Sequence, residues 1–233
     1  MTSISKINLK STNGEIDATT HAINIVLKKD DWLSDTYFAA IIESLQSLQV
    51  SLNRAIKQSK AESDLKGKDL TRDRALSELF SLVRGYTTVD SEIGIFAKRI
   101  ELVLNKYGLS KTTNSNYANE SAYINSLIID LSEGEVANAV RDCPFVAVAV
   151  SKLMDSQKAF EQAYEHYIVA MTKDRTKSSA TSIKANLVKV INNELVDYLR
   201  VMSKVNAEVY GPTTSKIAGI IKDNNERVKN RKG

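Results

Sequence analysis

Proline and glycine are scarce in this sequence, with 2 and 9 copies among 233 residues. Both residues mark turns, so an all-β fold with many tight turns is disfavoured. Long helices joined by short connections fit this composition better. Hydrophobic residues make up 42% of the chain and charged residues 26%. This is enough for a packed core and too apolar for a disordered chain.

Cysteine and histidine are nearly absent. Cys143 is the single cysteine, so neither an internal disulfide nor a thiolate metal cluster can form. The two histidines, His21 and His166, are preceded three positions earlier by Ala18 and Ala163, so the Glu-x-x-His motif of carboxylate-bridged di-metal bundles is missing. Zinc spacings, phosphate loops and dinucleotide-binding glycine patterns do not occur either. The sequence therefore predicts no cofactor, no metal and no catalytic residue.

Long hydrophobic runs are also missing. The longest uninterrupted one, Phe145 to Val150, is far shorter than the roughly 20 apolar residues that a membrane-spanning helix needs. The first ten residues, MTSISKINLK, lack the apolar core of a signal peptide. We therefore expect a soluble, cytoplasmic protein without a membrane partner.

Neither sign of charge dominates, because 32 basic residues face 28 acidic ones and the net charge is +4. A local basic excess lies near the C-terminus, at Lys222, Arg227, Lys229, Arg231 and Lys232, beside Asp223 and Glu226. Nucleic-acid binding needs such charges on one face, whereas isolated basic tails are commonly solvated. We expect a solvated tail, with a phosphate-binding tail as the alternative.

An apolar seam at heptad spacing runs through residues 76–107 and predicts a long helix that packs lengthwise on other helices. Its members are Leu76, Leu79, Val83, Tyr86, Asp90, Ile93, Ala97, Ile100, Leu104 and Tyr107. Asp90 is the polar member. It either caps a second helical segment at a kink or lies buried in the bundle and needs a partner.

The same pattern predicts long helices over residues 32–60, 142–173 and 183–210, and shorter ones over 15–29, 117–131 and 214–228. Asp30 or Asp31 is the expected N-cap of the helix over 32–60. Gly211-Pro212 is expected to end the helix over 183–210. Polar loops are predicted at 59–68, 111–116 and 174–181.

The two halves of the chain show the same arrangement of seams. One constant offset places Leu76 on Val188 and Tyr86 on Tyr198, and the same offset places the seam of 32–60 on that of 142–173. Two unrelated helical hairpins can also align in this way, because the starting position of each heptad pattern can be chosen freely to make them match. We predict an all-α fold in which four long helices form an up-down bundle, with short flanking helices. The expected organisation is a single domain over 1–233, with similar halves at about 15–108 and 117–230 and an N-terminal arm over 1–14.

Three short motifs give the chain a family resemblance. They are Ile4-x-x-Ile7-Asn8-Leu9, Asn13-Gly14-Glu15 and Asp69-x-x-Arg72-Asp73. With them the chain resembles an uncharacterised family of bacterial all-helical proteins, a domain of unknown function. The resemblance covers nearly the whole chain and implies a helical fold, but it brings no activity and no catalytic residues.

Two groups of residues are candidates for binding. Tyr164, Tyr167 and Tyr198 lie on seams and could line a pocket or a partner surface, although tyrosines at helical spacing usually belong to a core. Arg72 and Arg74 lie at the expected start of a helix, where an anion contact is one interpretation and a solvated, capped terminus is the other.

These observations favour a non-enzymatic helical interaction or scaffold protein that binds another protein or itself. The alternative is a small-molecule-binding protein, or an unrecognised enzyme, with a pocket between the two helical hairpins. Nucleic-acid association through the basic tail is the third and least favoured possibility. The sequence names no small-molecule ligand.

Overall fold

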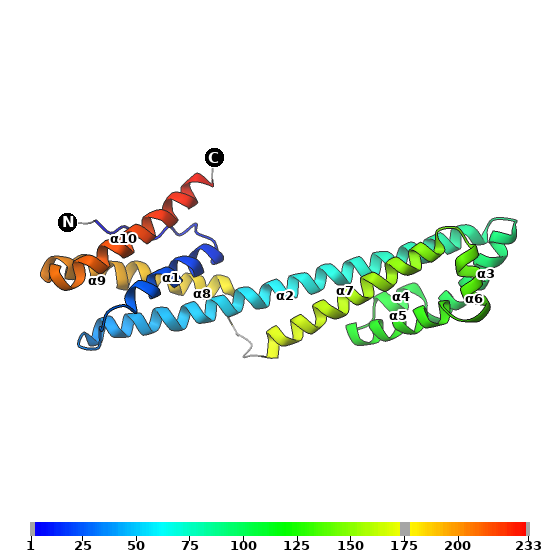
Figure 1. Ribbon diagram of the computed structural model, residues 1–233, viewed down its shortest axis with the longest axis horizontal. Helices are drawn as coiled ribbons and strands as arrows, with labels where there is room; N and C mark the ends of the chain where they lie inside the picture. Colours follow the sequence, from blue (N-terminus) through cyan, green and yellow to red (C-terminus); the bar gives the residue numbers. More distant parts are fainter. Residues whose placement is uncertain (1–2, 173–177, 232–233) are drawn as a thin grey trace. The chain divides into compact units, whose positions relative to one another are not determined.

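The computed structural model describes residues 3–172 and 178–231. Within these residues all regular structure is helical, which confirms the predicted all-α class (Figure 1). The elements are α1 (Asn13–Leu27), α2 (Thr36–Thr87), α3 (Glu92–Tyr107), α4 (Leu109–Thr113), α5 (Tyr117–Leu131), α6 (Gly134–Asp142), α7 (Val146–Thr172), α8 (Ala180–Val190), the π-helical turn η1 (Ile191–Leu195), α9 (Val196–Val205) and α10 (Ala207–Asn230). Residues 174–177 of the predicted loop over 174–181 lie outside the described residues.

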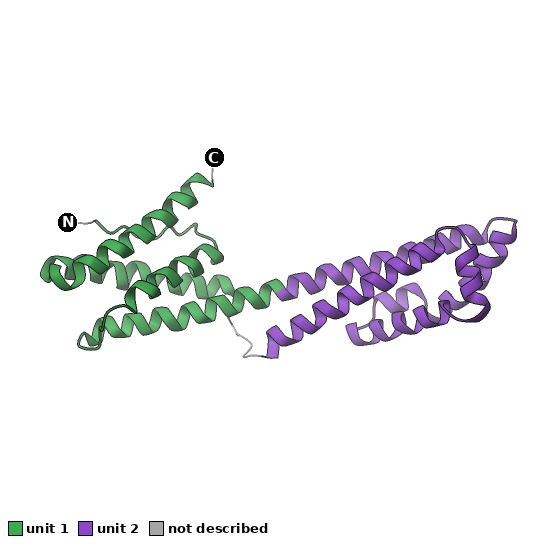
Figure 2. Cartoon of the chain, viewed as in Figure 1, with its two compact units in different colours: residues 1–60, 173–233 green, residues 61–172 purple. Residues whose placement is uncertain are grey.

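The chain forms two compact units (Figure 2). Unit 1 comprises residues 1–60 and 173–233, and unit 2 comprises residues 61–172. The predicted halves, 15–108 and 117–230, have other boundaries than these two units, and the similarity of the halves stays a prediction. The up-down arrangement of four long helices is likewise not confirmed.

The prediction of a loop at 59–68 is wrong, because α2 is one continuous helix through this stretch. The stretch contains a single glycine, Gly67, and no proline. An exposed glycine costs a helix only about 1 kcal/mol relative to alanine. Leu65 offsets this cost because it is buried against Phe160 and Ala163 of α7.

Unit 1 encloses a core between α1, the first part of α2, and the elements from α8 to α10. The chain enters α1 through a capping box, in which the Thr12 hydroxyl accepts from Glu15 N–H and the Glu15 carboxylate accepts from Thr12 N–H. Before it, residues 3–12 form a non-helical arm whose Ile4 and Ile7 are buried in the core.

The N-terminal arm is held by asparagine side chains. Asn192 of η1 accepts from Ile7 N–H at 2.7 Å and donates to the Ile7 carbonyl at 3.1 Å. Asn225 of α10 accepts from Asn8 N–H at 2.8 Å and donates to the Lys6 carbonyl at 2.9 Å. Each asparagine side chain thus supplies one hydrogen-bond donor and one acceptor to the backbone of the arm, as the backbone of a neighbouring strand would.

Two helix boundaries in unit 1 differ from the prediction. Asp35 starts α2, because its side chain accepts from Phe38 N–H and its carbonyl accepts from Ala39 N–H, whereas Asp30 and Asp31 precede the helix. The predicted stop at Gly211-Pro212 is also wrong, since both residues lie inside α10. The break comes earlier, at Asn206, whose side chain accepts from Val209 N–H and caps α10.

Unit 2 packs the second part of α2 antiparallel to α7. Along α2, Leu65 lies near Phe160, Arg72 contacts Gln157, and Glu78 pairs with Lys152, so the numbers fall along α7 as they rise along α2. Helices α3, α5 and α6 complete a core with buried members at Leu76, Leu79, Val83, Ile100, Leu104, Ile124, Leu127 and Leu153. The predicted range of α5, 117–131, matches the structure.

The predicted break near Asp90 is confirmed, but Asp90 is not the N-cap of the next helix. The chain leaves the helix after Thr87, and Ser91 is the N-cap of α3 without a side-chain cap bond. Asp90 is exposed, so it is not a buried polar residue of the seam either. The break is packed tightly, because a Cβ on Gly94 would come within 2.0 Å of the Val89 carbonyl oxygen.

Candidate functional site

Arg72 is the most unusual side chain of unit 2, because it is an arginine with 0% exposure in the middle of α2. Its Nη2 lies 2.7 Å from Asp69 Oδ1 and 2.6 Å from Glu120 Oε2. Its Nη1 donates to the hydroxyl of Ser121 at 3.0 Å and to Gln157 Oε1 at 3.2 Å. A buried guanidinium is tolerated when carboxylates and hydrogen bonds compensate its charge.

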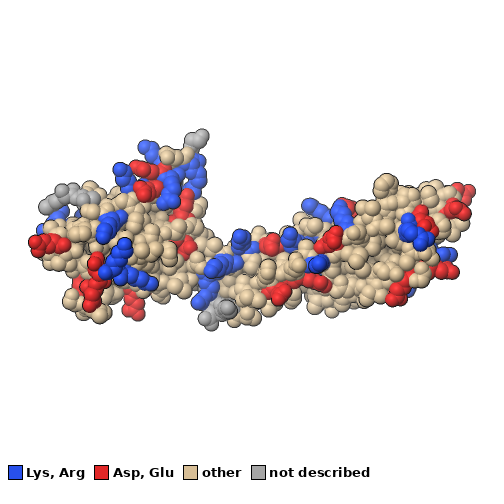
Figure 3. Space-filling model, in the orientation of Figure 1, with Lys and Arg blue, Asp and Glu red and all other residues tan. Residues whose placement is uncertain are grey.

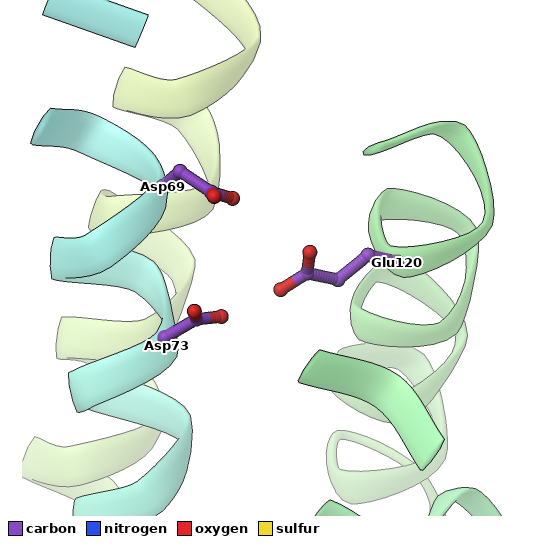
Figure 4. Close-up of side chains that lie close together, drawn as sticks. All are labelled: Asp69, Asp73 and Glu120. Atoms are coloured by element: carbon purple, nitrogen blue, oxygen red, sulfur yellow. The ribbon is translucent and has the colours of Figure 1, made fainter. Parts of the chain in front are cut away.

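Three carboxylates gather beside this arginine. Asp69 and Asp73 are four positions apart on α2 and therefore share one face of the helix. Glu120, from the first turn of α5, points toward both of them (Figure 4). One oxygen of each side chain lies within 4.8 Å of the others. Glu120 is 2% exposed, whereas the Asp69 side chain retains 24% exposure.

The cluster has more acceptors than donors. Glu120 Oε1 and Asp73 Oδ1 are buried and accept no hydrogen bond within the described chain, and Arg72 Nε is buried without an acceptor. Burial, followed by the neighbouring Asp73 carboxylate, raises the pKa of Glu120 to about 8, although Arg72 acts in the opposite direction. Burial also raises the pKa of Asp69 above its ordinary value, again against the effect of Arg72.

A row of aromatic rings extends from this cluster along α7. The Arg72 guanidinium carbon lies 3.6 Å from the centre of the Phe160 ring. Phe160 stacks on Tyr164 with ring centres 6.0 Å apart, and Tyr164 stacks on Tyr167 at 6.4 Å. Tyr117 of α5 makes edge contacts with Phe160 and Tyr164. The row passes from a fully buried ring to the exposed Tyr164.

A model of a protein family of unknown function, DUF6261, matches residues 62–225, which is more than half of the chain. The chain belongs to this family. The DUF6261 match contains all three carboxylates and Arg72, and it confirms the resemblance to a domain of unknown function. The match begins at residue 62, so the motifs at 4–9 and 13–15 lie outside it. Neither the curated proteins nor the solved structures compared with the chain give a match.

The candidate residues from the sequence lie in different environments in this DUF6261 chain. Tyr164 and Tyr167 are neighbours on α7 of unit 2, whereas Tyr198 lies on α9 of unit 1. The helix start that the predicted anion contact requires is absent, because Arg72 and Arg74 lie inside α2. Arg72 is instead paired with Asp69 and the buried Glu120, and Arg74 is exposed.

Sequence reasoning missed the three acidic residues as a group. Asp69 and Asp73 were visible as an i, i+4 pair around Arg72, within a motif that carried the family resemblance. Glu120 has no sequence marker, because its role depends on the packing of α5 beside α2. In retrospect, the signal is a basic residue flanked by two acids on one face of a long helix.

Tyr198 belongs to a second polar cluster, which lies in unit 1. Its hydroxyl and that of Tyr210 both donate to Asp35 Oδ2, while Phe38 N–H donates to Asp35 Oδ1. The rings of Trp32, Phe38, Tyr198 and Tyr210 pack against one another around this carboxylate. Burial raises the pKa of Asp35, but the tyrosine and backbone hydrogen bonds outweigh it and hold the pKa below its ordinary value.

An open groove of about 600 Å³ lies next to this second cluster. It is formed by the end of α1, the connection to α2 and the first turns of α2. Its walls include the aromatic ring of Trp32 and the carboxylates of Asp30, Asp31 and Glu43, with Lys28 as the basic residue. The groove therefore combines apolar area with a local excess of negative charge.

Charged side chains are mixed in sign on the face of the molecule drawn in Figure 3. Within the basic segment near the C-terminus, Arg231 is held by Glu15, with Nη1 2.8 Å and 2.9 Å from the two carboxylate oxygens. Lys222 pairs with Glu226 at 3.8 Å, and Lys232 lies outside the described residues. In the described part of the chain, no helix has both the length and the apolarity to cross a membrane.

Proposed function

We propose that this protein is a non-enzymatic helical interaction protein that presents the last turns of α7 to a protein partner or to a second copy of itself. The observation that supports this proposal is the outer end of the aromatic row. There Tyr164, Ile168 and Val169 are 36%, 41% and 53% exposed, and Tyr167 lies half-buried between them. We name these four residues the α7 surface.

The α7 surface has the composition of an interface centre. Tyrosine supplies a large contact area with few rotatable bonds, and aromatic residues are enriched where binding energy is concentrated. Stacking on Phe160, a ring that Arg72 also contacts, holds Tyr164 in one orientation. A side chain ordered before binding loses less entropy when a partner arrives.

Site-specific photo-crosslinking tests this proposal in the native host cell. A photoreactive phenylalanine analogue replaces Ile168 of the α7 surface, and a matched protein carries it at Ile95, which is 61% exposed on α3. We expect an intermolecular crosslink of defined mass from position 168 and not from position 95. Adding Tyr164→Asp should reduce the yield at position 168 at least tenfold, since a charge then lies in the interface. Equal crosslinking from both positions would contradict the proposal.

Self-association is the simplest form of this function and is measured separately. Sedimentation velocity of the purified chain over a hundredfold concentration range should show a dimer that Tyr164→Asp dissociates. Leu102→Asp, at a side chain with 71% exposure on α3, serves as the control and should leave the dimer unchanged. If the chain is monomeric at every concentration, the partner of the α7 surface is a different protein, and the crosslinked product identifies it.

The groove of unit 1 supports a second candidate function, small-molecule binding. Its volume of about 600 Å³ lies within the range of ligand pockets, and an aromatic ring with three carboxylates favours a cationic ligand. Native mass spectrometry of the purified chain tests this. A co-purified adduct that Glu43→Gln weakens supports the groove, whereas an adduct that persists in that variant or no adduct at all argues against it.

A further inference from the structure

The carboxylate cluster of unit 2 holds unbalanced charge. With Asp69, Asp73 and Glu120 ionised, three negative charges face one positive charge, that of Arg72. Glu120, at 2% exposure, uses one oxygen for Arg72 and leaves the other buried without a donor. Asp73 Oδ1 is buried without a donor as well. Buried acceptors without a partner are unfavourable, so these oxygens require a positively charged or hydrogen-bonding occupant.

We propose that Asp69, Asp73 and Glu120 bind a hard divalent cation of the Ca²⁺, Mn²⁺ or Mg²⁺ class, which links α2 to α5. The two orphaned oxygens supply contacts that the protein itself leaves open, and Figure 4 shows the three carboxylates directed toward a common space. A divalent charge also cancels the remaining two negative charges.

The donor set selects the class of metal. All three side chains offer carboxylate oxygen, and the group contains neither histidine nor cysteine. Oxygen ligands of this kind suit Ca²⁺, Mg²⁺ and Mn²⁺ rather than softer metals. Ca²⁺ binds oxygen at roughly 2.3–2.6 Å, so its ligands lie up to about 5 Å apart across the ion. The three carboxylate oxygens lie within 4.8 Å of one another, so one Ca²⁺ ion can contact all of them. Mg²⁺ should bind less readily, because it demands a near-ideal octahedral shell and gives up its water reluctantly.

The site is accessible from one side. The Asp69 side chain is 24% exposed, so water can enter there and complete the coordination shell. Arg72 does not block the site. It binds Asp69 Oδ1 and Glu120 Oε2 and leaves the other oxygen of Glu120 for the cation. Removing Glu120 or Asp73 therefore removes a ligand that no neighbouring residue replaces.

A single proton shared by Asp73 and Glu120 is the competing occupant. It would satisfy both orphaned oxygens and leave one uncompensated negative charge. The two possibilities differ in what the purified protein does when metal is added, so a binding measurement separates them.

Isothermal titration calorimetry of the full chain, freed of metal with a chelator, tests the proposal with Ca²⁺, Mn²⁺ and Mg²⁺ in turn. We expect one equivalent to bind, with Ca²⁺ or Mn²⁺ tighter than Mg²⁺. Glu120→Gln and Asp73→Asn should each weaken binding at least tenfold. Asp155→Asn, at an exposed carboxylate on α7 of the same unit, is the matched control and should leave the affinity unchanged.

Terbium luminescence gives a second readout that does not depend on heat. Tb³⁺ replaces Ca²⁺ at oxygen sites, and Tyr117 is a nearby sensitiser, since it shares the first turn of α5 with Glu120 and contacts Phe160, the ring beside Arg72. Tyr117→Phe should reduce the sensitised emission at least fivefold while calorimetric binding of Ca²⁺ persists. Asp69→Asn, at the partly exposed ligand, provides a variant that tests the site should the buried substitutions fail to give wild-type circular dichroism spectra.

Two results would overturn the proposal. The first is a wild-type chain that binds none of the three cations at millimolar concentration. The second is binding that Glu120→Gln, Asp73→Asn and Asp69→Asn all leave unchanged. The shared proton would instead explain the orphaned oxygens if two results came together. The wild-type chain would bind no metal, and the Glu120→Gln variant would melt at the same or a higher temperature. Each result leaves the crosslinking test of the α7 surface unaffected.

Discussion

Asp35 of unit 1 and Glu120 of unit 2 each belong to a cluster of polar and aromatic side chains, and the two carboxyl groups behave in opposite ways. Asp35 of unit 1 accepts hydrogen bonds from two tyrosine hydroxyls and a backbone N–H. Glu120 of unit 2 is paired with Arg72 but faces two further carboxylates. The pKa of Asp35 is lowered and that of Glu120 is raised to about 8.

This difference shows that burial alone does not determine the charge state of a carboxyl group. Burial raises the pKa in both places, and it is the largest single cause in each. Around Asp35 the donors outweigh it, whereas around Glu120 the nearby Asp73 adds to it and the opposing effect of Arg72 is too small. The donors in unit 1 complete a structural cluster, while the shortage of donors in unit 2 leaves room for a ligand.

Removing the positive charge from the unit 2 cluster should have the largest effect. In Arg72→Met, the carboxylates of Asp69 and Glu120 lose their partner, and breaking a buried ion pair on one side costs about 3–5 kcal/mol. Urea unfolding followed by far-ultraviolet circular dichroism measures the loss. Arg74→Met, at the exposed arginine two positions away, should change the free energy of unfolding by less than about 0.5 kcal/mol. Equal effects of the two variants would refute the central role of Arg72.

Removing the carboxylate from the unit 1 cluster should have a somewhat smaller effect. Asp35→Ala leaves two tyrosine hydroxyls without their acceptor and removes the N-cap contact to Phe38 N–H, so we expect a loss of about 2–3 kcal/mol. Trp32 is the single tryptophan and packs on Phe38 and Tyr210, so its fluorescence reports on unit 1.

Asp31→Ala is the control for this measurement. Asp31 is exposed in the same connection and accepts a local hydrogen bond from Leu33 N–H. Its removal should cost less than about 0.5 kcal/mol. A Trp32 unfolding curve that Asp35→Ala leaves unshifted would show that the tyrosine contacts contribute nothing to unit 1.

The two carboxyl groups also predict opposite pH dependences of stability, to be measured with a chelator present. The pKa of Asp35 is lowered by folding, so its contribution is present above the unfolded pKa of about 3.9 and is lost as the pH falls through the lower folded value. The pKa of Glu120 is raised, so its contribution is fully present below the ordinary value of 4.5 and is lost as the pH rises toward and through about 8.

Glu120→Gln isolates the second of these effects. The wild-type free energy of unfolding should fall between pH 5 and pH 8 by at most about 1.4 kcal/mol per pH unit, the limit for one proton. A glutamine side chain does not titrate, so the part of this decline that comes from Glu120 should disappear in the variant, while the contribution of Asp69, whose pKa is also raised, and the acid limb from Asp35 remain. An unchanged decline in Glu120→Gln would assign it to another group.

Local features of the fold could be predicted from the sequence because they depend on neighbouring residues. The range of α5 and the end of α3 at Gly108, where φ is 72°, follow from helix periodicity and glycine chemistry. The continuity of α2 could not be predicted, since it depends on burial of Leu65 against α7. Tertiary packing outweighed the polar composition of that stretch.

In the candidate site, too, local spacing could be predicted from the sequence and tertiary packing could not. Arg72 attracted attention in the sequence, but for a helix start that does not exist, and its buried state depends on α5 and α7. Asp69 and Asp73 share a helix face by spacing alone. Glu120 comes from a distant segment, and only the packing of α5 beside α2 within unit 2 brings its carboxylate to the pair on α2.

A third carboxylate, Asp90, gives the smallest expected effect and completes the comparison. It is exposed between α2 and α3, and Ser91 rather than Asp90 occupies the N-cap position. Among the described residues, it has neither the hydrogen-bond donors that surround Asp35 nor the neighbouring carboxylates that face Glu120. Asp90→Leu should therefore change the free energy of unfolding by less than about 0.5 kcal/mol in urea unfolding experiments. Loss of a capping contact would instead cost about 1 kcal/mol. A loss of that size, rescued by Asp90→Asn, would show that Asp90 caps α3 in solution, because asparagine keeps the accepting oxygen that leucine lacks.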